Sequence, residues 1–258
     1  MDGFEIVLLT AIGVGGATIL GSIIGFLFKK PSQRFSDIIL SFAAGVMLCA
    51  AVIGLIVPSI ELSSAQTPIK LLVTISGIIV GAIALNLIDR LVPHLHKLTG
   101  VDTETHPHKT EQLNKVLLFV IAIAIHNLPE GIAAGVSFGS ENTTHALVVA
   151  GGIALQNIPE GMVIIAPMIS AGMSKKRTFL IALSTGVVEV VGTLIGYFAV
   201  SISSMILPFA LAFAGGTMLY VISDEMIPET HSHGNERYAT YALLIGFVTM
   251  MAFDFLLG

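Results

Sequence analysis

Two short polar motifs interrupt long apolar runs of the sequence. The first reads His-Asn-Leu-Pro-Glu-Gly over residues 126–131, and the second reads Gln-Asn-Ile-Pro-Glu-Gly over residues 156–161. Because residues three and four positions apart share a helix face, each motif places its polar side chains beside its glutamate. These side chains are His126, Asn127, Glu130, Gln156, Asn157 and Glu160.

A divalent cation is the partner that these residue types favour. A carboxylate near the middle of a membrane span costs at least about 2.5 to 3.5 kcal/mol on insertion scales. Zinc takes imidazole nitrogen and carboxylate oxygen as ligands, and its charge offsets buried negative charge. A third carboxylate, Glu189, lies in another apolar run and is expected to share the site. The alternative for each glutamate is a structural role as a hydrogen-bonded neutral acid.

The proline of each motif has a separate effect. Pro129 and Pro159 have no N–H for the carbonyl four residues earlier, so each helix is expected to kink beside the polar cluster. Kinked helices at mid-membrane depth are typical of transporter sites. Because the two motifs lie on antiparallel spans, they predict an inverted repeat with the site at its interface.

The composition indicates an integral membrane protein. Of the 258 residues, 54% are apolar and 11% are charged, whereas a soluble domain carries about a quarter of charged residues. This deficit excludes an ordinary cytosolic enzyme, and the net charge of −5 excludes a nucleic-acid binder. The single cysteine, Cys49, provides neither an internal disulfide nor a C-x-x-C metal site.

The predicted fold is an all-α membrane domain that covers residues 1–258. The apolar runs are continuous rather than alternating, which argues against a β-barrel. They predict eight transmembrane helices over residues 4–28, 36–59, 69–88, 116–139, 145–172, 178–202, 204–223 and 238–257. The sixth and seventh spans are separated by a turn expected near residues 201–204.

The basic residues predict the orientation. Eleven of the twelve Lys and Arg residues lie in the connections that follow spans 1, 3, 5 and 7, and only Lys70 lies on the other side. By the positive-inside rule these connections are cytoplasmic and both termini are extracytoplasmic, as expected for a plasma (inner) membrane protein. The longest connection, residues 90–114, carries four histidines that could collect metal: His94, His96, His106 and His108.

Three other functions could use the buried polar residues. An intramembrane metalloprotease usually needs His-Glu-x-x-His or a second histidine, and the spans provide His126 alone. A cation or proton channel could use the same buried glutamates, and saturable uptake would distinguish a carrier from it. A metal sensor without transport is the third alternative. The residues favour a carrier with no catalytic cofactor.

The paired motifs resemble the span-4 and span-5 signatures of the ZIP family of divalent-metal transporters, most closely its GufA branch. Residues 42–47, Phe-Ala-Ala-Gly-Val-Met, are similar to the family's span-2 pattern, and the resemblance covers essentially the whole chain. It implies an alternating-access carrier that moves Zn²⁺, and often Cd²⁺, Fe²⁺ or Mn²⁺, into the cytoplasm. The outer helices would shift relative to spans 2, 4, 5 and 7.

The resemblance also implies a two-metal centre. One position would use Met47, His126, Glu130, Gln156 and Glu160. Its neighbour would use Asn127, Asn157, Glu189 and the shared glutamates. Many relatives have His in place of Gln156, and some have Asp in place of Asn157, which leaves selectivity and two-metal occupancy open.

Peripheral residues complete the expected pathway. The resemblance suggests an outer entrance near Asp254 and an inner exit near Asp89, Glu229, His231 and His233. A homodimer is left open. The Gly-x-x-x-Gly pairs at residues 77–81 and 192–196 suit either dimer packing or, as is more usual, contacts inside the bundle.

Overall fold

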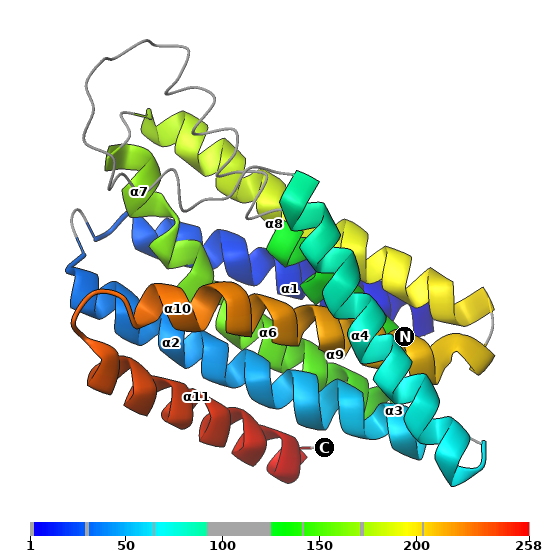
Figure 1. The fold of residues 1–258 in the computed structure, drawn as a ribbon. Helices are drawn as coiled ribbons and strands as arrows, with labels where there is room; N and C mark the ends of the chain where they lie inside the picture. Colours follow the sequence, from blue (N-terminus) through cyan, green and yellow to red (C-terminus); the bar gives the residue numbers. More distant parts are fainter. Residues whose placement is uncertain are drawn as a thin grey trace.

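A computed structural model describes residues 3–28, 31–63, 65–91, 125–140, 142–170, 173–202 and 204–257. Within these ranges the regular structure is helical throughout (Figure 1). Seven segments are long and apolar enough to cross a membrane. An eighth helix covers residues 125–137 and carries the first polar motif.

The long helices follow the apolar runs of the sequence. Five of them are α1 (Gly3–Gly25), α4 (Thr67–Leu91), α6 (Thr143–Val163), α8 (Lys175–Ile202) and α11 (Glu236–Leu257). The turn between the sixth and seventh spans lies near its expected position, since α8 ends at Ile202 and a 3-10 turn, η3 (Ser204–Ile206), leads into the next helix. Residues 92–124, which include the four loop histidines, lie outside the described ranges.

The fifth span divides into two helices. α6 ends at Val163, and a short helix, α7 (Ile165–Ser170), follows it in the same span. Pro167 lies in the first turn of α7 and has no N–H for the carbonyl of Val163. The helix therefore breaks at Ile164, close to the end of the apolar run.

Two spans contain a π-helical turn before a proline. The first consists of α2 (Gln33–Cys49), η1 (Ala50–Ile56) and α3 (Val57–Glu61), and the second of α9 (Leu207–Val221), η4 (Ile222–Met226) and α10 (Ile227–Thr230). Pro58 and Pro228 lie in the first turns of the helices that follow the π turns. The wider turn accommodates the proline ring, which would clash with the carbonyl of an α-helix.

Glycines let several helices approach at backbone distance, and the closest packing falls into two groups that meet where α2 packs against α6. In the first group, α1 packs against α6 and α8, and Gly135 of the helix 125–137 lies against the backbone of Thr193 in α8. In the second group, α2 packs against α11 and α4 packs against α9. The two Gly-x-x-x-Gly pairs also serve contacts inside the chain, with Gly81 against Phe213 and Gly196 against Ile132.

The basic helix starts gather at one end of the bundle. In Figure 1, α2, α8 and α11 begin at the end opposite to the marked termini, whereas α4 begins near the termini. Arg34, residues 175–177 and Arg237 belong to the first turns of α2, α8 and α11, and Lys70 belongs to the first turn of α4. The charge asymmetry of the sequence is thus also an asymmetry of the fold.

Replacing Gly45 with alanine is expected to destabilise the bundle. A Cβ at Gly45 would overlap the backbone of Leu243 in α11, whereas a Cβ at Gly16 would meet no atom within 4 Å. Overpacking costs about 1 to 3 kcal/mol, so Gly45→Ala lowers the apparent melting temperature in detergent by several degrees. Gly16→Ala, the matched control, leaves it unchanged or raises it. Equal melting temperatures for the two variants would contradict the assigned α2–α11 packing.

Candidate metal centre

Both polar motifs lie inside the bundle, on two adjacent parts of the first helix group. Asn127 and Glu130 are buried on the helix 125–137, and Gln156 and Asn157 are buried on α6. Glu160, one turn beyond Gln156, is partly buried. These polar side chains face the interior of the bundle, as the helical spacing of the motifs predicts.

Glu189 of α8 is the centre of a hydrogen-bond network. Its Oε1 atom accepts hydrogen bonds from Thr18 Oγ1 at 2.6 Å and from the Nδ2 atom of Asn127. Its Oε2 atom accepts one from Asn157 Nδ2 at 2.7 Å. The Nδ2 atom of Asn157 is also 3.3 Å from the carbonyl of Val14 in α1. One carboxylate thus joins α1, α6, α8 and the helix 125–137.

Thr18 is a member of this network that the sequence did not indicate. A threonine in a membrane helix usually donates to its own backbone, as Thr10 does to the carbonyl of Ile6 at 2.8 Å. The side chain of Thr18 instead crosses to α8 and is buried there. Its role depends on the position of α8, which no local pattern encodes.

Glu130 and Gln156 are buried without a hydrogen-bond partner in the part of the chain that the structure describes. Among the described residues, both carboxylate oxygens of Glu130 and both polar atoms of the Gln156 amide lack a partner, and the two side chains are 1% and 0% exposed. They lie near one another but do not form a hydrogen bond of normal geometry. Oε1 of Glu160 and Oδ1 of Asn157 also have no partner within the described ranges.

Unsatisfied oxygens at this depth are unfavourable unless something binds them. The carboxylates of Glu130, Glu160 and Glu189 lie close enough to repel one another, whereas His126 lies close enough to Glu160 to attract it. A buried acceptor that loses its partner costs about 1 to 3 kcal/mol, and more when it is charged. Carboxylate and amide oxygens of both motifs are therefore left inside the bundle without a partner among the described residues.

His126 has a partner on the second helix group. Its Nε2 atom is 2.7 Å from Oε1 of Glu225, which lies in the π-helical turn η4. The two side chains are 21% and 24% exposed, in contrast to the fully buried Glu130 and Gln156. Sequence reasoning missed Glu225 because it ended the seventh span at residue 223. The acidic pair 224–225 before Pro228 was the available signal.

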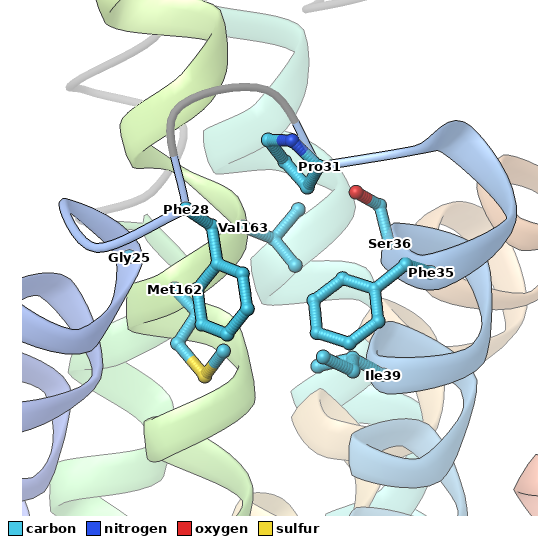
Figure 2. Close-up of a pocket in the computed structure, with 8 residues that line it drawn as sticks. All are labelled: Gly25, Phe28, Pro31, Phe35, Ser36, Ile39, Met162 and Val163. Atoms are coloured by element: carbon cyan, nitrogen blue, oxygen red, sulfur yellow. The ribbon is translucent and has the colours of Figure 1, made fainter.

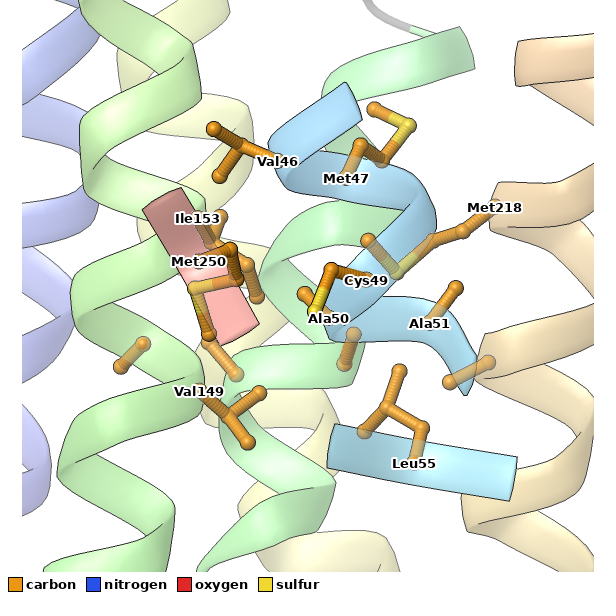
Figure 3. Close-up of a cluster of buried hydrophobic side chains, with 14 of the residues drawn as sticks. Val46, Met47, Cys49, Ala50, Ala51, Leu55, Val149, Ile153, Met218 and Met250 are labelled. Atoms are coloured by element: carbon orange, nitrogen blue, oxygen red, sulfur yellow. The ribbon is translucent and has the colours of Figure 1, made fainter. Parts of the chain in front are cut away.

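Met47 belongs to an apolar cluster in the structure. It is buried on α2 together with Cys49, and the cluster includes Leu55 of η1, Ile153 of α6 and Met250 of α11 (Figure 3). Its predicted role as a metal ligand stays a prediction. Within the described ranges, no three His, Cys, Asp or Glu side chains converge closely enough to hold a metal ion as they stand.

The other predicted residues lie at the ends of the bundle. Asp254 is half-buried on α11 within electrostatic reach of Cys49, and its Oδ1 atom has no partner among the described residues. Glu229 lies on α10, and His231 and His233 lie in the α10–α11 connection. Asp89 is part of α4, but its side chain is outside the description.

Two cavities lie between the two helix groups, and the larger one is lined in part by apolar residues of the second motif, Ile158 and Pro159. One is a small pocket between the α1–α2 connection and α6, lined by Phe28, Phe35 and Met162 among others (Figure 2). The other is an apolar groove of about 340 Å³ formed by α2, α6 and α11, with Phe42, Pro159 and Ile245 in its lining. The seam between the groups is therefore apolar at both places.

Comparison with known proteins gives consistent matches. A family model described as "ZIP Zinc transporter" matches residues 101–254. The chain is 40% identical over 254 residues to the zinc transporter GufA of Myxococcus xanthus, covering 97% of this chain and 98% of that protein. It is 35% identical to the zinc transporter ZIPB of Bordetella bronchiseptica, covering 94% and 78% of the two chains. It is 30% identical to human zinc transporter ZIP11, covering 94% of each.

Replacing Thr18 with valine is expected to weaken the Glu189 network. The change keeps the side-chain shape but leaves a buried carboxylate with one donor fewer, which costs about 1 to 3 kcal/mol. Thr18→Val therefore lowers the melting temperature in detergent, and Thr10→Val on the same helix changes it little. Equal melting temperatures for Thr18→Val and Thr10→Val would show that the network assignment is wrong.

Proposed function

The chain belongs to the ZIP family of zinc transporters, and from this premise we propose that it carries Zn²⁺ across the membrane into the cytoplasm by alternating access. The observation that carries this proposal is the pair of buried, unpartnered side chains Glu130 and Gln156. Burying such groups in a membrane protein is costly in free energy, and binding of a cation during the transport cycle would offset this cost.

The proposed binding position uses Glu130, Glu160, Gln156 and His126. Two carboxylates neutralise the dication, while the amide oxygen and the imidazole nitrogen are ligands that zinc also accepts. Since no three acidic or imidazole groups converge in the described residues, we propose that zinc itself draws the side chains together. His126 then exchanges Glu225 for the ion.

Asn127, Asn157 and Glu189 are better suited to support this position than to bind a second metal in the same conformation. Both amide nitrogens already donate to Glu189, so the carboxylate's oxygens are engaged. The proposed second role of the network is to hold the two motif helices against α1 and α8. A second ion would have to displace these hydrogen bonds.

The burial pattern supports a state that opens toward the cytoplasm. His126 and Glu225 are more exposed than Glu130, and Glu225 lies in η4, which leads into α10 at the end where the basic helix starts gather (Figure 1). In the apolar cluster (Figure 3), Leu55 and Met250 come late in the second and last spans, away from the basic starts of α2 and α11. We assign the basic end to the cytoplasm by the positive-inside rule.

The contacts favour a different moving unit from the one expected. The family resemblance implies that the outer helices shift relative to spans 2, 4, 5 and 7, but the close contacts join α1, α6, α8 and the helix 125–137 into one group. We propose that this group moves as a body against α2, α4, α9 and α11. The apolar seam between α2 and α6 allows sliding without breaking hydrogen bonds.

Replacing either motif glutamate with alanine is expected to abolish zinc flux. Glu130→Ala and Glu160→Ala each remove a carboxylate from the proposed position, so zinc uptake into proteoliposomes falls to the level of empty liposomes. The measurement is the initial rate of uptake reported by an internal zinc-sensitive dye.

Glu61→Ala is the matched control, because Glu61 is an exposed glutamate at the end of α3. It is expected to leave the rate unchanged. Wild-type flux in Glu130→Ala or Glu160→Ala would contradict the proposed site, and non-saturating uptake in the wild type would favour a channel.

A further inference from the structure

The larger of the two cavities is an apolar groove near the basic end of the bundle. It measures about 340 Å³ and lies between α2, α6 and α11. All of its lining residues are apolar, among them Phe42 of α2, Met162 of α6, and Ala242 and Ile245 of α11. Ile245 is 59% exposed whereas Ala242 is buried. The groove is therefore open along the rim that Ile245 forms.

The sequence of α6 explains where this groove begins. In the half of the bundle away from the basic helix starts, Gly152 of α6 lies against the side chain of Met250 in α11, so the two helices approach closely there. Further along α6 the groove is lined by Pro159 and Met162 instead of glycines. Side chains of this size hold neighbouring helices apart, and the groove occupies the wider part.

Two arginines lie beyond the groove, at the basic starts of α2 and α11. Arg34 precedes Phe42 by eight residues, and Arg237 precedes Ile245 by eight residues. At a rise of about 1.5 Å per residue, each arginine is about 12 Å along its helix from that lining residue. The headgroup region of one leaflet is roughly 5 to 8 Å thick. With the groove among the acyl chains, both arginines are therefore at the level of the headgroups.

Arg34 is held in position by an aromatic ring of α11. Its Cζ atom is 3.6 Å from the centre of the Tyr238 ring, a cation–π contact that joins α2 to α11. At this distance the guanidinium lies flat on the ring, and its in-plane N–H donors stay available to an anion. Asp37 does not neutralise it, because that carboxylate is only 2% exposed and accepts hydrogen bonds from Gln33 and Asn235.

We propose that the groove binds an anionic phospholipid, with an acyl chain between α2, α6 and α11 and the phosphate on Arg34 and Arg237. The lining side chains have no hydrogen-bonding group, which suits a hydrocarbon chain. Arginine binds phosphate through paired N–H donors, so the charge at this end favours an anionic headgroup over a zwitterionic one. Because α6 belongs to one helix group and α2 and α11 to the other, the lipid would contact both.

The test compares two phospholipids that differ only in their headgroup. Native mass spectrometry of the full chain in detergent measures the dissociation constants of phosphatidylglycerol and phosphatidylcholine with the same acyl chains. The wild type is expected to bind phosphatidylglycerol more tightly. Arg34→Gln is expected to weaken phosphatidylglycerol binding about fivefold, the effect of one basic residue near an anionic lipid surface, and to leave phosphatidylcholine binding unchanged.

Arg177→Gln is the matched control for charge. Arg177 is also exposed in the first turn of a helix at the basic end, but that helix is α8, which does not line the groove. The variant is expected to bind both lipids as the wild type does. An equal loss in Arg34→Gln and Arg177→Gln would reveal only a general attraction between charges and would overturn the site. Equal affinities of the wild type for the two lipids would also overturn it.

A second pair of variants tests the place of the acyl chain. Ala242→Leu fills part of the groove and is expected to weaken the binding of both lipids. Ala252→Leu makes the same change at an exposed position of the same helix and is expected to have no effect. If Ala242→Leu does not fold, Ile245→Trp, which narrows the rim, takes its place.

Two results would contradict the assignment of the groove. One is wild-type binding of phosphatidylglycerol by Arg34→Gln, and the other is wild-type binding of both lipids by the groove-filling variant. The binding measurements contain no zinc, so their failure would leave the proposed transport function untouched.

Discussion

The structure depends on how a few carboxylates are accommodated away from water. Thr18, Asn127 and Asn157 donate hydrogen bonds to Glu189, so both oxygens of this carboxylate have partners inside the bundle. Glu130 has no such donors among the described residues. The difference distinguishes one buried acid that holds helices together from one that we propose binds a cation.

This division connects the packing to the proposed movement. The Glu189 network ties α1, α6, α8 and the helix 125–137 into one body, and backbone contacts at glycines such as Gly135 reinforce it. The hydrogen bond between His126 and Glu225 links that body to the π-helical turn of the other group. Because that link shares its histidine with the proposed zinc position, binding of the ion and the contact between the two bodies are coupled.

The sequence was informative wherever a local pattern determined the outcome. The motif spacing indicated that the polar side chains of residues 126–130 and 156–160 face inward. The low content of charged residues indicated the long apolar helices. The sequence did not indicate Thr18 or Glu225. Each of these acts through a partner that lies far away in the sequence, and an isolated threonine or glutamate in a helix has ordinary local alternatives. The division into two helix groups also depends on contacts that periodicity does not encode.

The proposed site is tested most directly by locating zinc, through anomalous scattering at the zinc edge, in crystals of the full chain grown with the metal. We predict a peak among Glu130, Gln156 and Glu160, with glutamate oxygens about 2.0 to 2.2 Å from the ion. Zinc bound elsewhere in the membrane-embedded part, with Glu130 and Glu160 still without a ligand, would contradict it.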